Sequence, residues 1–234
     1  DVSAELKYLL SPAELARETV DAINARIFAE FTFDSFRWQQ ENRVSVSESF
    51  RADGLNRVLY KCPHCLTEGE MEGKGTTLVC RHCHKEYHLT EFGALEALDG
   101  EAAFTHVPDW YAWERQCVRE ELQNGSYVLD IPVRICMMVN TRQICRVGEG
   151  RLHHDADGFH LTGCGGKLDY FQKPTASYSL YADYFWYEIG DMLCIGDRKT
   201  LYYCFPLEGG DIVAKTRLAA EELYKLKRAS RALG

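Results

Sequence analysis

The chain has 234 residues, of which 46% are hydrophobic, and a formal net charge of −8 at pH 7. This length allows one large domain or two small ones, and the hydrophobic fraction is sufficient for a folded core. The acidic balance argues against a general nucleic-acid-binding protein, which would carry a basic surplus. No run approaches the roughly eighteen apolar residues that a membrane span needs.

Residues 1–50 predict a helical segment. Ser11, Pro12 and Glu14 form a capping box with proline at the first helical position. Apolar residues then recur at helical spacing, and the face they form needs a cover. These residues are Leu15, Val20, Ile23, Ile27 and Phe31. Phe36 and Trp38, a little further on, offer a second anchoring contact.

Residues 51–93, which we call the ribbon, contain two Cys-x-x-Cys pairs separated by fourteen residues. The pairs are Cys62 with Cys65 and Cys80 with Cys83. Four thiolates at this spacing suit a tetrahedral Zn²⁺ in a closed structural site, with free or redox-active thiols as the alternative. A hairpin, with Gly73 and Gly75 in its turn, brings the second pair to the first.

The residues around the cysteines raise two further questions. Four histidines could replace a thiolate as ligands, but a four-cysteine site leaves no vacancy, so we expect them to be exposed or beside the sulfurs. They are His64, His82, His84 and His88. Glycine often follows the second cysteine of a knuckle, where a left-handed backbone is easiest. Here those positions hold Leu66 and His84, so either strain is tolerated or the turns differ.

Residues 94–126 predict a linking helix from about Asp109 to Gln123, which Pro108 starts and Asn124-Gly125 ends. Trp110 and Trp113 lie on one face of this helix. Such a pair either packs against the neighbouring domain or docks at a membrane interface.

Residues 127–234 predict a β-rich domain of about seven strands closed by a C-terminal helix. Turn residues at 155–158 and 196–199 mark two hairpins. The whole chain is therefore expected to be α+β: N-terminal helices, a zinc ribbon, a linking helix, and a barrel or curled sheet with an outline like pleckstrin-homology (PH) or GRAM domains. Since the last segment is rich in aromatic and branched residues, we expect it to keep its fold when zinc is removed.

Three groups in this β-rich segment have both a functional and a structural interpretation. Histidines and aspartates near residue 155 resemble a second metal cluster, although aspartate and glycine also make turns. The group comprises His153, His154, Asp155, Asp157 and His160. Aromatic side chains could line a ligand groove or form core. They are Tyr178, Tyr181, Tyr184, Phe185, Trp186, Tyr187, Tyr202, Tyr203 and Phe205.

The third group lies in the closing helix, where basic residues outnumber acidic ones. Val213, Leu218, Leu223 and Leu226 are expected to enter the core. Lys215, Lys225 and Arg228 would then be free for solvent or for the phosphates of an anionic lipid surface.

The cysteines also indicate a compartment. There are ten, without a secretory signal or a small disulfide-scaffold pattern, so a reducing cytosol fits best. Cys136, Cys194 and Cys204 have apolar neighbours, as small core residues do. Since the first residue is Asp1 rather than Met, we interpret the chain as either a fragment of a longer protein or a processed form, and the sequence leaves both alternatives open.

No catalytic motif is recognisable: there is no Gly-x-Ser-x-Gly, phosphate loop or zinc-protease helix signature. None of the eight histidines has an aspartate five positions later. Whether the chain is itself an enzyme stays open, since a site in the aromatic strands would carry no known motif.

Four segments together resemble the C-terminal region of bacterial 1-acyl-sn-glycerol-3-phosphate acyltransferase-like proteins. They are residues 51–65, 106–111, 131–133 and 184–191. In that family a His-x-x-x-x-Asp motif of an N-terminal domain provides the general base, and this chain lacks the motif. The resemblance therefore implies parentage but transfers no catalytic residue, whereas the family's cysteine pairs match Cys62, Cys65, Cys80 and Cys83.

The expected function is thus a non-catalytic accessory region of a phospholipid or glycerol acyltransferase. It would hold a structural zinc ribbon and a ligand- or membrane-facing β module. Expected partners are the upstream acyltransferase domain and an anionic membrane surface, with no nucleic acid. The expected location is cytoplasmic and peripheral at the inner membrane. The alternative is a zinc-ribbon module that binds a protein or peptide and is unrelated to acyl transfer.

Overall fold

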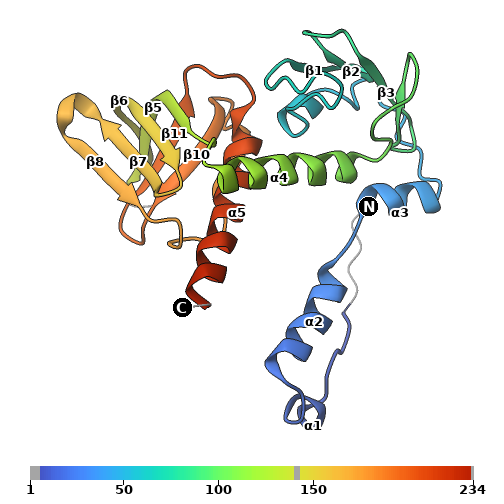
Figure 1. Cartoon of the computed structure of the whole chain (residues 1–234), viewed down its shortest axis with the longest axis horizontal. Coiled ribbons are helices and arrows are strands. Elements are labelled where there is room, and N and C mark those ends of the chain that lie inside the picture. The colour runs from blue at the N-terminus through green and yellow to red at the C-terminus, as the bar shows by residue number, and fades with distance from the viewer. Residues whose placement is uncertain (1–5, 140–142, 233–234) are drawn as a thin grey trace.

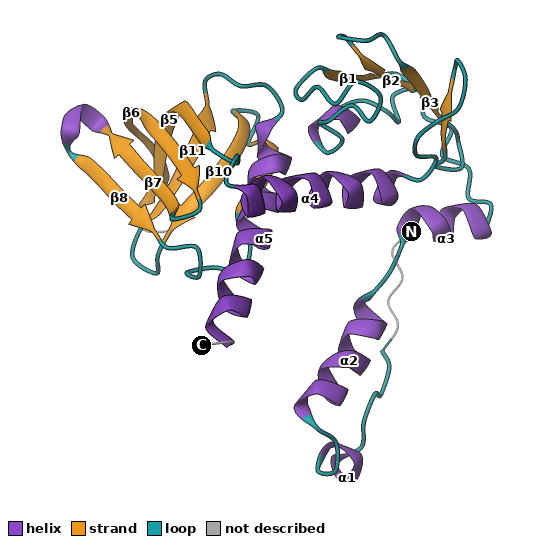
Figure 2. Cartoon of the chain, in the orientation of Figure 1, coloured by secondary structure: helices purple, strands orange, loops and turns teal. Residues whose placement is uncertain are grey.

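The computed structural model describes residues 6–139 and 143–232 (Figure 1). Short helices come first, then a small four-stranded sheet, a long helix and a large seven-stranded sheet followed by a C-terminal helix (Figure 2). Both sheets are antiparallel. The predicted α+β class is therefore confirmed.

The N-terminal segment forms three short helices, α1 (Pro12–Leu15), α2 (Val20–Phe31) and α3 (Ser35–Glu41). The predicted capping box at Ser11 is present. The helical spacing is interrupted because the Thr19 hydroxyl accepts a hydrogen bond from the Ala22 N–H and so begins α2 anew. None of the residues in these three helices is buried. Residues 6–33, which we call the arm, extend away from both sheets (Figure 1).

Helix α3 attaches the arm to the rest of the chain. One Asp34 oxygen caps α3 by accepting from the Arg37 N–H at 2.9 Å, and the other lies 2.6 Å from Nε2 of His106. Phe36 packs against the core of the small sheet, as expected of an anchoring residue. Trp38 remains 47% exposed, so it does not share that anchoring role.

The small sheet has the order β1 (Met71–Lys74), β2 (Thr77–Cys80), β3 (Glu86–Leu89) and β4 (Leu95–Ala97). A 3-10 turn, η1 (Leu55–Arg57), precedes it. Gly75 lies in the β1–β2 turn with φ +64°, as predicted. Gly73 lies within β1 instead, where a Cβ atom would collide with the backbone of Ala52 and Leu55. Its role is therefore close packing rather than turning, which corrects the prediction.

Helix α4 (Val107–Asn124) closes the core of the small sheet. It ends at Gly125 in the left-handed conformation, as the sequence predicts. Trp110 has no exposed surface, meets the ring of Tyr87 edge-on at 5.0 Å, and donates from Nε1 to the Lys61 carbonyl at 3.0 Å. Trp113 packs against Phe104 at 5.6 Å. Trp110 is therefore a core residue, and the membrane-docking interpretation is wrong for it.

The large sheet has the order β8-β7-β6-β5-β11-β10-β9. Its strands are β5 (Leu129–Val139), β6 (Gln143–Asp155), β7 (Gly158–Gly163), β8 (Leu168–Gln172), β9 (Tyr181–Trp186), β10 (Gly190–Gly196) and β11 (Leu201–Pro206), with a 3-10 turn η2 (Cys164–Gly166) before β8. Both predicted hairpins are present, between β6 and β7 and between β10 and β11.

The sheet curls but does not close, because β8 and β9 are its two edges. Across the curl, the Gln172 Oε1 atom accepts a hydrogen bond from the Gly196 N–H at 2.9 Å. One face forms the main core with Val133, Leu193 and Cys204 among its members. Residues that alternate with these on β10 and β11 form a second cluster on the opposite face.

Helix α5 (Ile212–Ala232) packs against the large sheet and against α4. Val213, Leu218 and Leu223 are buried, as predicted, and Leu226 is half-buried. Ala214, Leu218 and Ala219 share a cluster with Tyr60, Val118 and Tyr127. A fragment that begins at residue 127 therefore lacks part of the packing of α5.

Charged side chains join the same three elements. Lys61 Nζ lies 3.1 Å from Glu68 and 3.6 Å from Glu121, and Lys215 Nζ lies 2.7 Å from each of these two carboxylates. Lys215 was expected to be free for solvent or lipid. It is instead in an ion-pair network, because α5 approaches the ribbon and α4 at this point.

A second network links α4 to α5. Glu222 is 1% exposed and lies within 3.4 Å of Arg115, Arg119 and Lys225. Lys225 is thus also paired rather than free, and the Arg228 guanidinium lies over the ring of Tyr224 at 5.8 Å. Burial opposes the ionisation of Glu222, but hydrogen bonds from Lys225 and Arg115 outweigh it and lower the pKa of this carboxyl.

None of the described helices is long and apolar enough to span a lipid bilayer.

Glu114 gives a test of how α4 holds the ribbon. Its side chain is buried, and Oε1 accepts from the Lys61 N–H at 2.8 Å, whereas Oε2 has no hydrogen-bond partner among the described residues. Burial raises the pKa of Glu114 to about 9, against the opposing effect of the backbone N–H groups. The carboxyl is therefore neutral at pH 7.

Since the folded-state pKa exceeds the unfolded value, this group's contribution to stability is complete below about pH 4.5 and is lost progressively as the pH rises to about 9. We expect Glu114→Gln, which cannot ionise, to gain about 4 kcal/mol of stability relative to the parent between pH 5 and pH 8, because each pH unit above the unfolded pKa costs the parent about 1.4 kcal/mol. Urea unfolding of the metal-loaded proteins at both pH values measures this. An equal difference at both would contradict a neutral Glu114.

Candidate metal centre

Each cysteine pair lies in a tight turn held by backbone hydrogen bonds. In the first, the Cys62 N–H donates to the Thr67 carbonyl at 2.9 Å, and the Leu66 N–H donates to the Cys62 carbonyl at 2.9 Å. Pro63 and His64 follow Cys62 at the point where the chain reverses, so both sulfurs of the pair face the same side. Two residues between the cysteines are therefore enough to form a turn that places both sulfurs on the same side.

The second turn repeats the first. The Cys80 N–H donates to the Lys85 carbonyl at 2.9 Å, and the His84 N–H donates to the Cys80 carbonyl at 2.8 Å. Cys80 is the last residue of β2, and β3 begins three residues after Cys83, so the small sheet fixes this turn.

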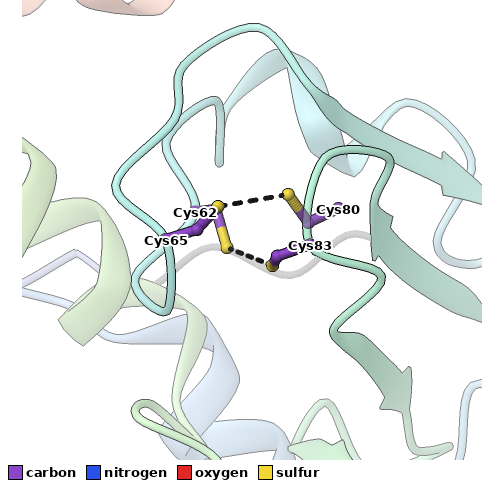
Figure 3. Close-up of side chains that lie close together, drawn as sticks. All are labelled: Cys62, Cys65, Cys80 and Cys83. Atoms are coloured by element: carbon purple, nitrogen blue, oxygen red, sulfur yellow. Dashed lines mark hydrogen bonds between the residues drawn. The ribbon is translucent and has the colours of Figure 1, made fainter.

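The four sulfurs converge on one point (Figure 3). The Sγ atoms of Cys62 and Cys83 are 3.7 Å apart, those of Cys65 and Cys80 are 3.6 Å apart, and all four lie within 4.8 Å of one another. A disulfide would need about 2.05 Å. A metal held tetrahedrally at about 2.3 Å from each sulfur sets the sulfurs about 3.8 Å apart. The predicted ligand set is thus assembled in the geometry of a metal site.

The sulfurs also interact with one another electrostatically. Burial raises the pKa of Cys62 and of Cys83, and their sulfurs share hydrogen bonds with neighbouring thiols. Burial opposes ionisation of Cys65 too, but hydrogen bonds from Thr67, Cys83 and His82 outweigh it and lower the pKa of this thiol to about 5. Four thiolates at these distances repel strongly, and a cation between them is what allows all four to ionise.

Thr67 is a residue that the cysteine spacing does not reveal. Its hydroxyl lies 2.9 Å from the Cys65 sulfur and 3.7 Å from the Cys80 sulfur, so it bridges the two turns. A hydroxyl two positions after the second cysteine of a pair is the sequence signal that could have indicated it.

The histidines beside the cysteines are not part of the sulfur cluster. His64, His82 and His84 are exposed, as expected. His88 is half-buried, and its Nε2 lies 3.4 Å from the Arg51 guanidinium.

The two turns adopt the conformation that glycine usually provides. Leu66 has φ +65° and His84 has φ +61°, both in the left-handed region. Of the two alternatives that the sequence left open, strain or a different turn, the structure shows the strained left-handed backbone. A non-glycine residue in this region costs of order 1–3 kcal/mol.

We expect Leu66→Gly to stabilise the metal-loaded protein by about 0.5–1 kcal/mol, because relief of strain exceeds the entropy that glycine gains in the unfolded chain. The Leu66 side chain is 61% exposed, so little packing is lost. Denaturant titration measures the gain. Leu98→Gly, at an exposed leucine with no positive φ, serves as control and should not stabilise.

The second cluster proposed from the sequence does not assemble among the described residues. His153 pairs with Asp155 at 3.1 Å, whereas His160 pairs with Asp169 of β8 at 2.7 Å. His154 is buried, stacks on Phe159 at 3.7 Å, and has its pKa lowered to about 3 by burial. Asp155 caps the hairpin turn by accepting from the Asp157 N–H. The structural interpretation is therefore correct.

The aromatic residues divide between core and surface. Trp186 stacks on Tyr203 at 4.6 Å, and with Phe205 these residues are buried in the second cluster of the large sheet. Others are exposed: Tyr178, Tyr181, Phe185 and Tyr187. Cys136, Cys194 and Cys204 are buried, as their apolar neighbours predict.

Comparisons of the chain with protein-family models, with curated proteins and with solved structures find no match in any of the three.

Proposed function

We propose that Cys62, Cys65, Cys80 and Cys83 hold one structural zinc ion. Four thiolates in tetrahedral array are a donor set typical of zinc, with iron as the main competitor. All four positions around the metal would be filled by protein, which leaves none for a substrate or water. The sulfur geometry is the observation that supports this proposal.

We further propose that the chain is a non-catalytic accessory module that docks on another folded domain through its arm. The observation that supports this proposal is that large apolar side chains of the arm are exposed. Phe28, Phe31 and Phe33 are 75%, 83% and 69% exposed, and no residue of α1 or α2 is buried. An apolar surface of this kind marks an interaction site.

The occupant we propose is an acyltransferase-like domain of the parent protein. The resemblance of residues 51–65, 106–111, 131–133 and 184–191 supports this choice. A PH/GRAM-like architecture for the large sheet is proposed as well. It is supported by seven antiparallel strands in which the first, β5, lies beside the last, β11, with α5 following.

The docking proposal is tested with a bacterial 1-acyl-sn-glycerol-3-phosphate acyltransferase domain, of the kind that the resemblance implies, expressed separately. Calorimetry should show binding to this chain, and Phe28→Ser with Phe31→Ser should weaken it by at least about a hundredfold, since two large apolar contacts are lost. Asp21→Asn, a polar change in the first turn of α2, is the matched control and should bind as the parent does.

Two results would overturn the proposal. One is equal binding by the double variant. The other is concentration-dependent self-association that the same double variant abolishes, because the arm would then belong to an interface between two copies. If instead a peptide or unrelated protein bound the ribbon, the alternative function would hold.

This chain alone should not transfer acyl groups, because no His-x-x-x-x-Asp pair is present to activate a hydroxyl acceptor. The assay is acyl-CoA consumption with lysophosphatidate present, and consumption should equal that of buffer. Turnover that a single substitution in this chain removes would show that it is an enzyme.

A cytoplasmic location, peripheral at the membrane, is also part of the proposal. The surface that supports it is an open hollow of about 680 Å³, lined by Lys173, Lys227 and the exposed Phe171. Two lysines beside an exposed aromatic ring suit contact with anionic lipid. Flotation with vesicles of anionic lipid should retain the parent chain and lose Lys173→Glu with Lys227→Glu. Equal flotation of both, or none of the parent, would remove the membrane from the proposal.

A further inference from the structure

A small cavity lies where β10 begins and β11 ends, beside the middle of β5. It has a volume of about 230 Å³, and its walls include Ile189, Phe205 and Leu207 together with Arg134, Asp191 and Glu208. Ile189 and Leu207 are among the exposed large apolar side chains, so the cavity has an uncovered apolar wall. Its size suits a ligand smaller than a drug-sized molecule.

Arg134 brings an unused positive charge to this cavity. It lies on β5, opposite Phe205 of β11, and its Nε atom is buried without a hydrogen-bond partner. No ion pair joins Arg134 to any carboxylate in the described parts of the chain. A guanidinium has five donors that match a carboxylate, and a buried donor without an acceptor is costly.

The two carboxylates of the cavity differ. Asp191 is already engaged: one oxygen accepts from the Phe185 N–H at 2.9 Å, and the other lies 3.7 Å from the Arg57 guanidinium. Glu208 has neither a hydrogen bond nor an ion pair within the described residues, although it lies in the electrostatic field of Arg151. Arg134 and Glu208 therefore face the same cavity with opposite charges and do not pair with each other.

The loop beside the cavity is strained. Tyr187 and Glu188 have φ +45° and +59°, and they precede Ile189 and Gly190 of the cavity wall. Non-glycine residues in this conformation cost free energy and are found at ligand-holding loops. This strained turn therefore leads directly into Ile189 and Gly190 of the cavity wall.

We propose that this cavity binds a free α-amino acid with an apolar side chain. The ligand carboxylate would pair with Arg134, its ammonium group with Glu208, and its side chain would cover Ile189 and Leu207. A zwitterion satisfies two opposite charges that the protein keeps apart, whereas a simple anion would leave Glu208 unpaired and a simple cation would leave Arg134 unpaired. This proposal does not depend on the docking or acyltransferase proposals.

Three matched probes test the proposal on the full chain in its metal-loaded form, by calorimetry and by amide chemical shifts. L-leucine has both charges, leucinamide lacks the carboxylate, and 4-methylpentanoate lacks the ammonium group. L-leucine should bind, and each analogue should bind at least about tenfold more weakly, as expected for one lost charged hydrogen bond. No binding of L-leucine, or equal binding of either analogue, would overturn the proposal.

Variants test the two residues. Arg134→Gln should lose L-leucine binding, while Arg198→Gln, a change at an exposed arginine in the β10–β11 turn that does not line the cavity, should keep it. Should Arg134→Gln fail to fold, Glu208→Gln at an exposed position gives the same test. It should reduce the affinity for L-leucine but leave that for 4-methylpentanoate unchanged. Unaltered L-leucine binding in a folded variant of either residue would overturn the assignment.

Discussion

Cys80→Ser is expected to lose the metal and to unfold the ribbon while the large sheet remains folded. A structural zinc ion contributes roughly 10–16 kcal/mol to modules that cannot bury a sufficient core, and the small sheet has only short strands. The large sheet has its own core, which contains none of the four clustered cysteines. Hydrogen exchange should therefore show fast exchange in β1–β3 and protection in β5–β11.

Elemental analysis provides the direct measurement, with about one zinc per parent chain and much less in the variant. Cys145→Ser, a half-buried cysteine outside the cluster, is the matched control and should keep its metal. A folded parent protein in which the four thiols form disulfides would contradict the zinc proposal. Loss of protection across the large sheet in Cys80→Ser would show that this sheet depends on the metal.

Trp110→Ala is expected to destabilise the metal-loaded protein by about 3–5 kcal/mol, the usual cost of removing a fully buried large aromatic side chain. The substitution removes the contacts with Tyr87 and Phe104 and the hydrogen bond to the Lys61 carbonyl. Because Lys61 precedes Cys62, the first cysteine turn also loses its support. Denaturant unfolding gives the free energy, and competition with a chelator gives the metal affinity, which should fall.

Trp38→Ala is the control for Trp110, since it removes the same side chain where it is about half exposed. We expect this variant to stay within about 0.5 kcal/mol of the parent. A loss below about 1 kcal/mol in Trp110→Ala would mean that the surrounding side chains collapse into the space, and that the indole is not the main contact of α4 with the ribbon.

The cysteine cluster and the hairpins could be predicted from the sequence because their causes are local. Two residues between cysteines define a turn whose hydrogen bonds join residues at most five positions apart, and Gly125 ends α4 through its own left-handed backbone. The burial of Val213 and Leu218 follows in the same way from helical spacing. Local patterns of this kind are independent of how the sheets are arranged.

The errors concern residues whose environment is created by distant segments. Lys215 has its partner Glu68 147 positions away, so a helical pattern alone leaves it exposed. Likewise, no local pattern indicates that the approach of the ribbon buries Glu114. The sequence predicts Gly73 in a turn, whereas its role is close packing against Ala52, which comes from another part of the chain. The spacing of apolar residues within one helix or strand cannot indicate which distant segment will pack against that helix or strand.

Tyr60 has a consequence for how the parts of this protein communicate. It stands two residues before Cys62, and its ring packs with Ala214 and Leu218 of α5 and with Val118 of α4. The packing contact between the ribbon, α4 and α5 therefore adjoins the four cysteines. If the proposed zinc ion binds there, any influence that favours this packing raises the affinity for the metal by the same free energy, and metal binding favours the packing in return. Through the ring of Tyr60 the proposed ion would then affect the seating of α5 as well as the ribbon itself.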